Sequence, residues 1–197
     1  MTAKLIIRLL ALGVRLVKRR IADGDETAFP DLSEPLARRR ASGAARLAAR
    51  QALAALGGPF DAALPRSHGR YPVWPAGFVG SVAHDEEKAV AVAARASDFL
   101  ALGIDVEPAE PLPLEVADIA LFGAERGEAA ADPPRGRAIF AAKEAVYKAI
   151  NPLDGTPLEY EDIEVDLAAG RARIRDGRTL RLEWSSGARF IVVALAR

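Results

Sequence analysis

The C-terminal part of this 197-residue chain carries a repeating pattern that limits its fold more than any other feature. Four short runs of alternating apolar residues are separated by turn signals, and one of these turns is Asp176-Gly177. Asp-Gly between two such runs is typical of a β-hairpin. We therefore expect consecutive strands, joined by tight turns, at residues 163–167, 171–175, 179–184 and 189–194.

Two long segments with few helix-breaking residues precede these strands. Residues 33–56 are rich in alanine, with Ser33 as the expected N-cap and Gly57-Gly58-Pro59 as the stop. A second helix is predicted over 136–150, opened by Asp132-Pro133-Pro134 and stopped by Asn151-Pro152. Three shorter elements are also predicted: a helix near 114–122, and strands at 89–94 and 100–107 joined by a turn around Ser97-Asp98. The fold class that follows is α+β.

Two segments are less defined by their sequence. Residues 5–20 mix apolar and basic positions and fit either a strand pair or an amphipathic helix. Residues 57–80 hold glycine, proline and tryptophan in dense alternation, which predicts an ordered, extended loop.

Charge and composition exclude several classes of protein. The chain has 27 basic and 27 acidic residues, which argues against a nucleic-acid-binding protein. It has no cysteine and two histidines, so disulfides, thiolate zinc sites and multi-histidine metal clusters are excluded, and a metal would be held mainly by carboxylates. Arg8 and Arg15 interrupt the first apolar run, and no apolar stretch reaches the length of a membrane span. We expect a cytoplasmic globular protein.

The zero net charge is a cancellation along the chain. Residues 1–70 hold 13 basic and 6 acidic side chains, residues 71–134 hold 3 and 12, and residues 135–197 hold 11 and 9. The cationic first part suits a phosphate-rich nucleotide, and the acidic middle part contains two candidate metal ligands.

These two candidates lie in the segment Gly103-Ile104-Asp105-Val106-Glu107. Residues two apart on a strand share a face, so Asp105 and Glu107 project together while Ile104 and Val106 enter the core. Paired carboxylates repel each other unless a cation lies between them. A solvated outer strand face is the alternative interpretation.

The predicted helix at 136–150 adds a second set of charged residues. Glu144 and Lys148 are four residues apart and share one side, whereas Lys143 falls beside the apolar stripe and needs an anionic partner. Taken alone, this pattern also fits an ordinary surface ion pair. Combined with Asp105 and Glu107, it favours magnesium-assisted phosphoryl transfer.

The chain resembles the 4′-phosphopantetheinyl transferases, specifically the larger, two-lobed type that activates siderophore and peptide synthetases. Four blocks follow the family order. The first block is a looser match, the arginine-rich stretch Arg38–Arg50. The second block is WP-x-G…GS-x-x-H, formed by Arg70–Pro75, Gly77 and Gly80–His84. The third is G-I-D-x-E at Gly103–Glu107, and the fourth is A-K-E-A-x-Y-K at Ala142–Lys148.

This resemblance implies transfer of 4′-phosphopantetheine from coenzyme A to a serine hydroxyl of an apo carrier protein, with release of adenosine 3′,5′-bisphosphate. Asp105, Glu107 and Glu144 would hold Mg²⁺, or Mn²⁺ in its place. Lys143 and Lys148 would meet phosphate oxygens. Glu144 would act as the base, directly or through a water, and Lys148 would stabilise the leaving group. The nucleotide would contact four residues: Arg38, Arg46, Arg70 and His84.

The same resemblance implies a fold of two similar small lobes, a pseudo-dimer. Each lobe is a helix packed on a mainly antiparallel sheet, and the active site lies in the cleft between them. We assign residues 1–98 to the lobe that binds the nucleotide end of coenzyme A and residues 99–197 to the lobe with the metal ligands. A monomer acting on acyl, peptidyl or aryl carrier proteins of secondary metabolism, including siderophore biosynthesis, is expected.

Two alternatives belong to other functional classes. A protein that binds coenzyme A or a nucleotide without catalysis would share most of these residues, although all three carboxylates are present. A metal-dependent nuclease also pairs strand carboxylates with a lysine. That lysine usually lies two residues after the second acid, where this chain has Ala109, and the neutral net charge disfavours nucleic-acid binding.

Overall fold

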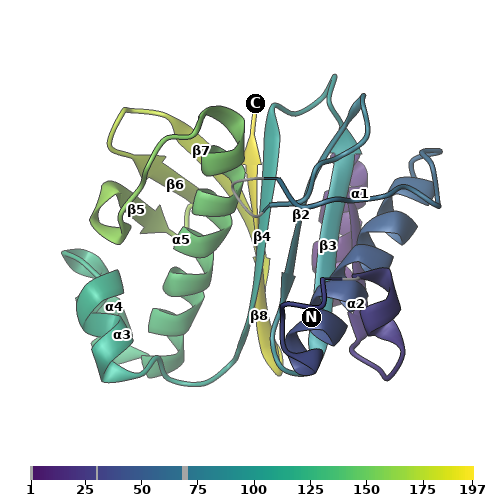
Figure 1. The fold of residues 1–197 in the computed structure, drawn as a ribbon. Helices are drawn as coiled ribbons and strands as arrows, with labels where there is room; N and C mark the ends of the chain where they lie inside the picture. Colours follow the sequence, from purple (N-terminus) through teal and green to yellow (C-terminus); the bar gives the residue numbers. More distant parts are fainter. Residues whose placement is uncertain (1, 30, 68–70) are drawn as a thin grey trace.

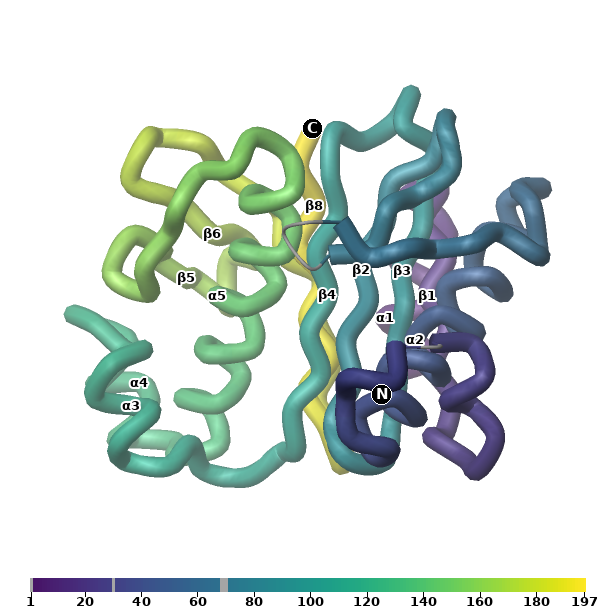
Figure 2. Tube along the Cα trace, in the orientation of Figure 1, coloured from purple at the N-terminus to yellow at the C-terminus, as the bar shows by residue number. Residues whose placement is uncertain are grey.

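The structure is a computed structural model that describes residues 2–29, 31–67 and 71–197 (Figures 1 and 2). The elements follow in chain order: α1 (Thr2–Ala11), β1 (Arg15–Arg20), the 3₁₀ turn η1 (Asp25–Ala28), α2 (Leu36–Ala54), β2 (Phe78–His84), β3 (Lys88–Arg95), β4 (Ala101–Pro108), α3 (Leu114–Ala120), α4 (Ala124–Ala131), α5 (Pro133–Asp154), the 3₁₀ turn η2 (Tyr160–Asp162), β5 (Ile163–Asp166), β6 (Arg171–Ile174), β7 (Thr179–Ser185) and β8 (Arg189–Ala196).

These strands form two sheets, each from one part of the chain. The first has the order β1-β3-β2, and the second has the order β4-β8-β7-β6-β5. All paired neighbours are antiparallel. The predicted α+β class is therefore confirmed, and the four predicted C-terminal strands are all present.

The two sheets pack face to face. Helix α2 covers the outer side of the first sheet, and α5, with α3 and α4 beside it, covers the outer side of the second. Alternate residues of β3 separate the layers, since Val90 and Val92 lie in the core between the sheets while Ala91 and Ala93 pack against α2. The core on the far side of the second sheet is built largely by α5. Figure 1 shows the resulting order of α5, second sheet, first sheet and α2.

Strand β4 follows the same alternation, and this decides where its acidic residues point. Ile104 and Val106 are buried between the sheets, as predicted. Their neighbours on β4 face the opposite way, toward α5. Gly103 allows the close approach of this helix, because a Cβ atom at residue 103 would lie 1.8 Å from the carbonyl oxygen of Ala145.

The start of α2 and the end of α5 differ from the predictions. Ser33 is not the N-cap of α2, because Pro35 occupies that position and the Ser33 hydroxyl donates to Asp31 at 2.5 Å. Helix α5 does not stop at Asn151-Pro152. It continues to Asp154 and ends at Gly155, which adopts the left-handed conformation with φ of 72°.

Other differences concern elements that the sequence pattern did not reveal. Strand β2 begins inside the segment predicted as a loop, and α4 was not predicted. Residues 5–20 combine the end of a helix with a strand, so neither simple interpretation was complete. The turn at Ser97-Asp98 joins β3 to β4 across the two sheets and does not close a hairpin.

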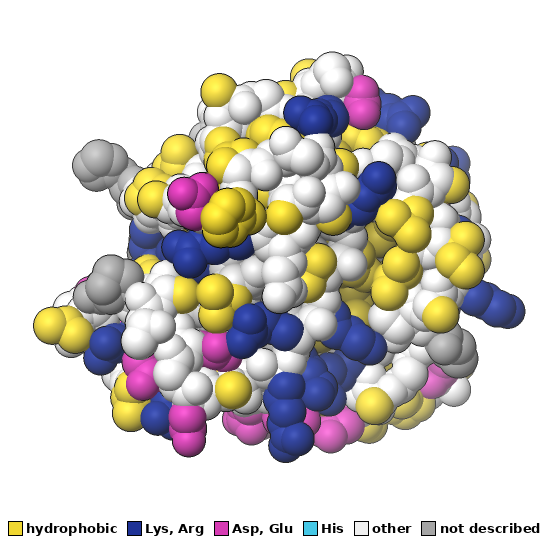
Figure 3. All heavy atoms as spheres, turned by 90° about the vertical axis from the view of Figure 1, so that its right-hand side faces the viewer, with side chains coloured by type: hydrophobic (Ala, Val, Ile, Leu, Met, Phe, Trp, Pro, Cys, Tyr) yellow, Lys and Arg dark blue, Asp and Glu magenta, His cyan; other side chains and the backbone are white. Residues whose placement is uncertain are grey.

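Basic side chains gather on the face of the molecule that carries α2. Figure 3 views the molecule from the side of α2 and shows Lys and Arg side chains gathered in the lower half of that face, with acidic side chains beside them. Among the described residues, no helix has the length and apolar character needed to cross a membrane.

Candidate active site

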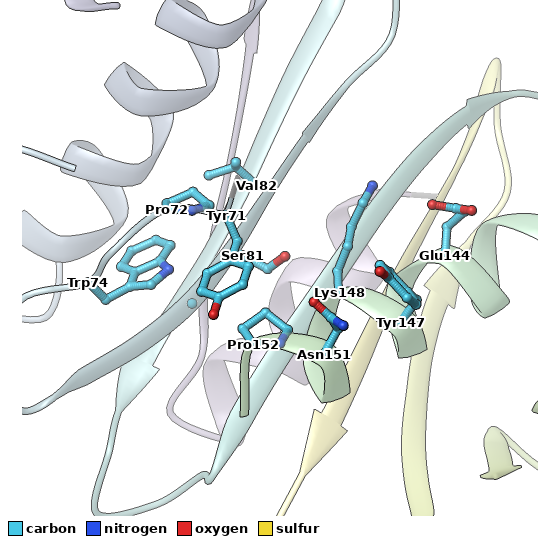
Figure 4. Close-up of a pocket in the computed structure, with 11 residues that line it drawn as sticks. Tyr71, Pro72, Trp74, Ser81, Val82, Glu144, Tyr147, Lys148, Asn151 and Pro152 are labelled. Carbon is cyan, nitrogen blue, oxygen red and sulfur yellow. The ribbon is translucent and has the colours of Figure 1, made fainter. Parts of the chain in front are cut away.

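A pocket of about 280 Å³ opens between the loop before β2, strand β2 itself and helix α5 (Figure 4). Its lining residues therefore come from both halves of the chain: Tyr71, Pro72, Trp74, Gly80, Ser81, Val82, Glu144, Tyr147, Lys148, Asn151 and Pro152. Figure 4 shows the side chains of Glu144, Tyr147 and Lys148 on α5, with Ser81, Tyr71 and Trp74 on the other side of the pocket. The pocket combines an apolar, aromatic wall with a cation and a carboxylate.

Asp105 lies next to this pocket, in contact with Lys148. It is only 5% exposed, and its Oδ1 atom accepts a hydrogen bond of 2.6 Å from the Lys148 ammonium. Its Oδ2 atom is buried without any hydrogen-bond partner. Burial raises the pKa of Asp105 to about 6, against the pull of Lys148 and with the help of two nearby carboxylates.

The other two predicted metal ligands each contact one donor. Glu107 accepts a bond of 2.9 Å from Arg137 at its Oε2 atom. Glu144 accepts a bond of 2.6 Å from the Tyr160 hydroxyl at its Oε1 atom. Burial, followed by the hydrogen bond to Glu144, raises the pKa of Tyr160, so the hydroxyl stays protonated and donates.

Lys148 is the cation at the centre of this group. Burial opposes its charge, but Asp105, Glu144 and Glu107 outweigh that effect and raise the pKa of Lys148. An ammonium has three donors. A hydrogen bond to Asp105 therefore leaves two of them for a ligand in the pocket.

Lys143 lies away from the pocket, so its predicted contact with phosphate oxygens is not supported by its position. The side chain is fully buried, forms an ion pair of 2.7 Å with Glu125 and donates to the carbonyl of Tyr160 at 2.9 Å. The sequence had indicated that this lysine needs an anionic partner. The partner is a carboxylate of α4 rather than a ligand.

His84 lies at the end of β2, on the side of Lys148. Partial desolvation, together with the positive charges of Lys148 and Arg38, lowers the pKa of His84. The Arg38 side chain is 58% exposed and contacts Glu34 at 3.4 Å. The lowered pKa favours the neutral imidazole of His84, so the positive charge at this surface comes from Lys148 and Arg38.

Asp85, which directly follows His84, is held by neighbouring groups. Asp85 accepts hydrogen bonds from the backbone N–H groups of Glu87 and Lys88 and forms an ion pair with Arg189. Asp85 is thus engaged within its own turn and with β8.

Arg46, predicted to line the same nucleotide end, is almost completely buried. Its guanidinium donates to the carbonyls of Leu64 and Ser42 and lies 4.1 Å from the ring centre of Phe29. Burial, together with Arg66 and Arg50 nearby, lowers the pKa of Arg46 to about 10. It borders a separate pocket of about 610 Å³ rather than the pocket at Lys148. Arg70 lies outside the described residues.

Two groups of residues at the site were not singled out by the sequence pattern. Arg137 and Tyr160 contact the carboxylates, but they lie 30 and 16 residues from their partners in the sequence. Helix and strand periods relate only residues within one element, so they do not predict these contacts. Tyr71 and Tyr147 line the pocket; each lies inside one of the motif blocks, Arg70–Pro75 and Ala142–Lys148, but neither was among the predicted site residues.

The carboxylates suit a magnesium ion in their chemistry. All three are oxygen donors, and Asp105 has a buried oxygen that no other group satisfies. As the side chains stand, the described residues contain no preformed group of three acidic or histidine side chains for a metal. Lys148, Arg137 and Tyr160 each hold one of the carboxylates, so ion binding would require Lys148 to share or leave Asp105.

Comparison with known proteins shows the family. The 4′-phosphopantetheinyl transferase N-terminal domain matches residues 33–94, and the 4′-phosphopantetheinyl transferase superfamily matches residues 101–194. The 4′-phosphopantetheinyl transferase Svp of Streptomyces mobaraensis is 39% identical over 170 residues, which cover 77% of this chain and 69% of that protein. The chain belongs to the 4′-phosphopantetheinyl transferase superfamily. The predicted family and enzyme class are thereby confirmed.

Other transferases of the superfamily show similar identity over shorter stretches. Npt of Nocardia iowensis is 37% identical over 131 residues, which cover 65% of this chain and 59% of Npt. PptT of Mycobacterium tuberculosis is 39% identical over 124 residues, which cover 61% and 54%. Among solved structures, the Thermotoga maritima holo-[acyl-carrier-protein] synthase has 19% identity and a TM-score of 0.40 over 50% of this chain and 64% of that one.

Proposed function

We propose that this transferase moves 4′-phosphopantetheine from coenzyme A to a serine hydroxyl of an apo carrier protein, with Mg²⁺ at the site and adenosine 3′,5′-bisphosphate as the second product. The observation that carries the proposal is the pocket shared by both halves of the chain. Glu144 and Lys148 line it, and Asp105 lies in contact with Lys148 with one oxygen unsatisfied.

Asp105, Glu107 and Glu144 would hold the metal. When bound, Mg²⁺ supplies positive charge to the oxygens of the pyrophosphate and so favours charge development on them. Mn²⁺ accepts the same oxygen donors and would substitute.

Glu144 would take the proton of the carrier serine, directly or through a water. Its Oε1 atom is engaged by Tyr160, which leaves Oε2 for this role. The serine oxygen forms a bond to the phosphorus next to the pantetheine arm, and the bond from that phosphorus to the oxygen bridging the two phosphates breaks. The serine proton goes to Glu144, and the electron pair leaves with adenosine 3′,5′-bisphosphate.

Lys148 would donate to the phosphate oxygens through the donors that Asp105 does not use. A fixed cation at this point stabilises the negative charge of the leaving group, and such positioned charges provide most of the catalysis in phosphoryl transfer. The apolar wall at Tyr71 and Trp74 suits the uncharged pantetheine arm.

His84 and Arg38 would bind the phosphates of the nucleotide. Arg38 supplies positive charge, and the neutral imidazole of His84 still has one N–H to donate to a phosphate oxygen. Arg46 and Arg70 were predicted to bind the same end. For Arg46, the hydrogen bond to the carbonyl of Leu64 in the loop before β2 and the stacking on Phe29 support a structural role instead. We propose two lobes on this basis. Residues 1–98 bind the nucleotide end of coenzyme A, and residues 99–197 carry the metal ligands.

We further propose that one chain is active as a monomer, because both sides of the pocket belong to the same chain. Cytoplasmic carrier proteins of siderophore and other secondary pathways are the proposed substrates. Sedimentation at assay concentrations tests the first point, and a panel of fatty-acid, polyketide and peptide-synthetase carriers tests the second.

Intact-mass spectrometry of an apo carrier protein tests the function. With coenzyme A and Mg²⁺, the carrier is expected to gain one phosphopantetheine group. The gain should disappear with excess chelator and return when Mg²⁺ or Mn²⁺ is restored. An unmodified carrier under all metal conditions, with every carrier of the panel, would contradict the proposal.

A further inference from the structure

Arg137 holds one of the proposed metal ligands from outside the metal site. Its Nη1 atom donates to Glu107 at 2.9 Å, Nε donates to the carbonyl of Glu110 at 3.2 Å, and Nη2 donates to the carbonyl of Pro111 at 2.8 Å. The Arg137 side chain is only 15% exposed. One guanidinium thus fixes both the carboxylate at the end of β4 and the chain that follows it.

The place of Arg137 on α5 gives these contacts a consequence for the site. It precedes Glu144 by seven residues, which is close to two full turns, so both side chains lie on the same side of α5. Glu107 comes from β4 and Glu144 from α5. Arg137 therefore links the strand that carries two of the proposed ligands to the helix that carries the third.

Its contact engages only one oxygen of Glu107. In the described part of the chain, the Oε1 atom of this carboxylate has no hydrogen-bond partner, so it is available to an ion. Donors outside a metal site commonly orient carboxylate ligands in this way, and their loss weakens metal binding by roughly 10-fold to 100-fold. A planar guanidinium with three directed bonds fixes the carboxylate more narrowly than a lysine would.

We infer that Arg137 is a positioning residue that aims Glu107 at the metal of the transfer reaction. This inference rests on the proposed function, and it assigns Arg137 a task that a simple anchor of the loop at 109–113 would not have. An anchor would affect stability alone, whereas a positioning residue affects metal affinity in the folded protein.

The test measures Mn²⁺ binding by electron paramagnetic resonance in the presence of coenzyme A, together with the Mg²⁺ dependence of carrier modification. Arg137→Met and Arg137→Lys are compared with the wild type. Arg135→Met is the matched control, because Arg135 also lies on α5 and pairs at 3.0 Å with Glu128, outside the site. Circular dichroism melting shows which variants are folded at the assay temperature.

For Arg137→Met, Mn²⁺ affinity is expected to fall by roughly 10-fold to 100-fold, with a matching rise in the Mg²⁺ concentration for half-maximal rate. Arg137→Lys keeps one positive charge, so its Mn²⁺ affinity should lie between those of Arg137→Met and the wild type. Arg135→Met should bind Mn²⁺ like the wild type. If Arg137→Met does not fold, Arg137→Lys alone tests the inference, and its Mn²⁺ affinity is expected to be at least threefold lower than that of the wild type.

Wild-type Mn²⁺ affinity in the folded Arg137 variants would overturn the inference while leaving the proposed function intact. Equal losses in the Arg135→Met control would also overturn it. If the wild type binds no Mn²⁺ and modifies no carrier, the proposed function fails, and the inference fails with it.

Discussion

Lys143 is a fully buried lysine immediately before Glu144 on α5. It pairs with Glu125 of α4 and also donates to the backbone of η2, the turn that supplies the Tyr160 hydroxyl to Glu144. A buried charge is tolerated only when it is paired and hydrogen-bonded. The pair therefore holds together the elements that surround the proposed base.

Lys143→Met should lower the free energy of unfolding by about 3–5 kcal/mol, because it leaves the buried Glu125 carboxylate unpaired. Urea denaturation followed by circular dichroism measures this loss. Adding Glu125→Gln should recover part of the stability, because it removes the unpaired charge and keeps an oxygen for the backbone N–H groups of Phe122 and Val165. Lys4→Met, a change of an exposed lysine on α1, should have no effect. Full stability combined with weaker coenzyme A binding would show instead that Lys143 reaches the ligand.

Tyr160→Phe removes only the hydroxyl that donates to Glu144, while the ring keeps its packing against Phe140 at 5.7 Å. The net value of such a bond is ~1 kcal/mol, or about a fivefold effect. We expect kcat to fall by about that factor with an unchanged KM for coenzyme A, and the melting temperature to fall by roughly 2–4 °C. An unchanged kcat would mean that the hydroxyl does not orient the base.

Single residues differ in how far the sequence predicts their role. The shared face of Asp105 and Glu107 was predictable because strand alternation fixes it. The pairing of Lys143 was only half predictable: its place beside the apolar stripe demanded a carboxylate, but the helix that supplies Glu125 carries a weak pattern. Contacts such as Tyr160 to Glu144 depend on how separate elements pack, and no local spacing encodes them.

Among the elements, the contact between β4 and α5 matters most for the site, and it depends on Gly103. A side chain at residue 103 would meet the backbone of α5 at residue 145, where no flexible group can give way. The close approach brings Glu144 and Lys148 beside Asp105. Separation of the strand from the helix would take the three carboxylates apart.

Gly103→Ala should destabilise the protein by about 3 kcal/mol and abolish carrier modification, because the helix must shift away from the strand. Gly127→Ala is the matched control. Gly127 lies in α4 with open space around its Cα, so alanine should raise stability by roughly 0.5–1 kcal/mol. Thermal and urea unfolding compare the two. Normal stability of Gly103→Ala would contradict this packing.

The elements with strong periodicity or clear turn signals were predicted, and the rest were not. Strand β2 is built from small residues such as Gly80 and Ser81, which carry little strand signal. Gly80 is required by packing, since a Cβ there would lie 2.5 Å from the ring of Trp74. Helix α5 continues past Pro152 to Asp154. A proline inside a helix removes one backbone hydrogen bond, and this loss costs little so close to the end of the helix.

The whole molecule brings together parts of the chain that are far apart in sequence. The cationic first part supplies Arg38, and the acidic middle supplies Asp105 and Glu107. The pocket lies where β2 meets α5. The family resemblance implied a site shared by two lobes. It did not predict that the lobes pack sheet against sheet, because the apolar residues of β3 and β4 fit burial against a helix equally well.

We propose above all that Glu144 of this pocket, with Asp105 and Glu107 beside it, catalyses the transfer of phosphopantetheine. Single-turnover modification of an apo carrier protein, followed by intact mass, tests it most directly with the wild type and Glu144→Gln at saturating coenzyme A and Mg²⁺. The substitution preserves size and removes the charge that accepts the serine proton. We expect complete modification by the wild type and a rate at least 100-fold lower for Glu144→Gln, roughly the contribution of a positioned base. Equal rates for the two proteins, both with coenzyme A bound, would contradict it.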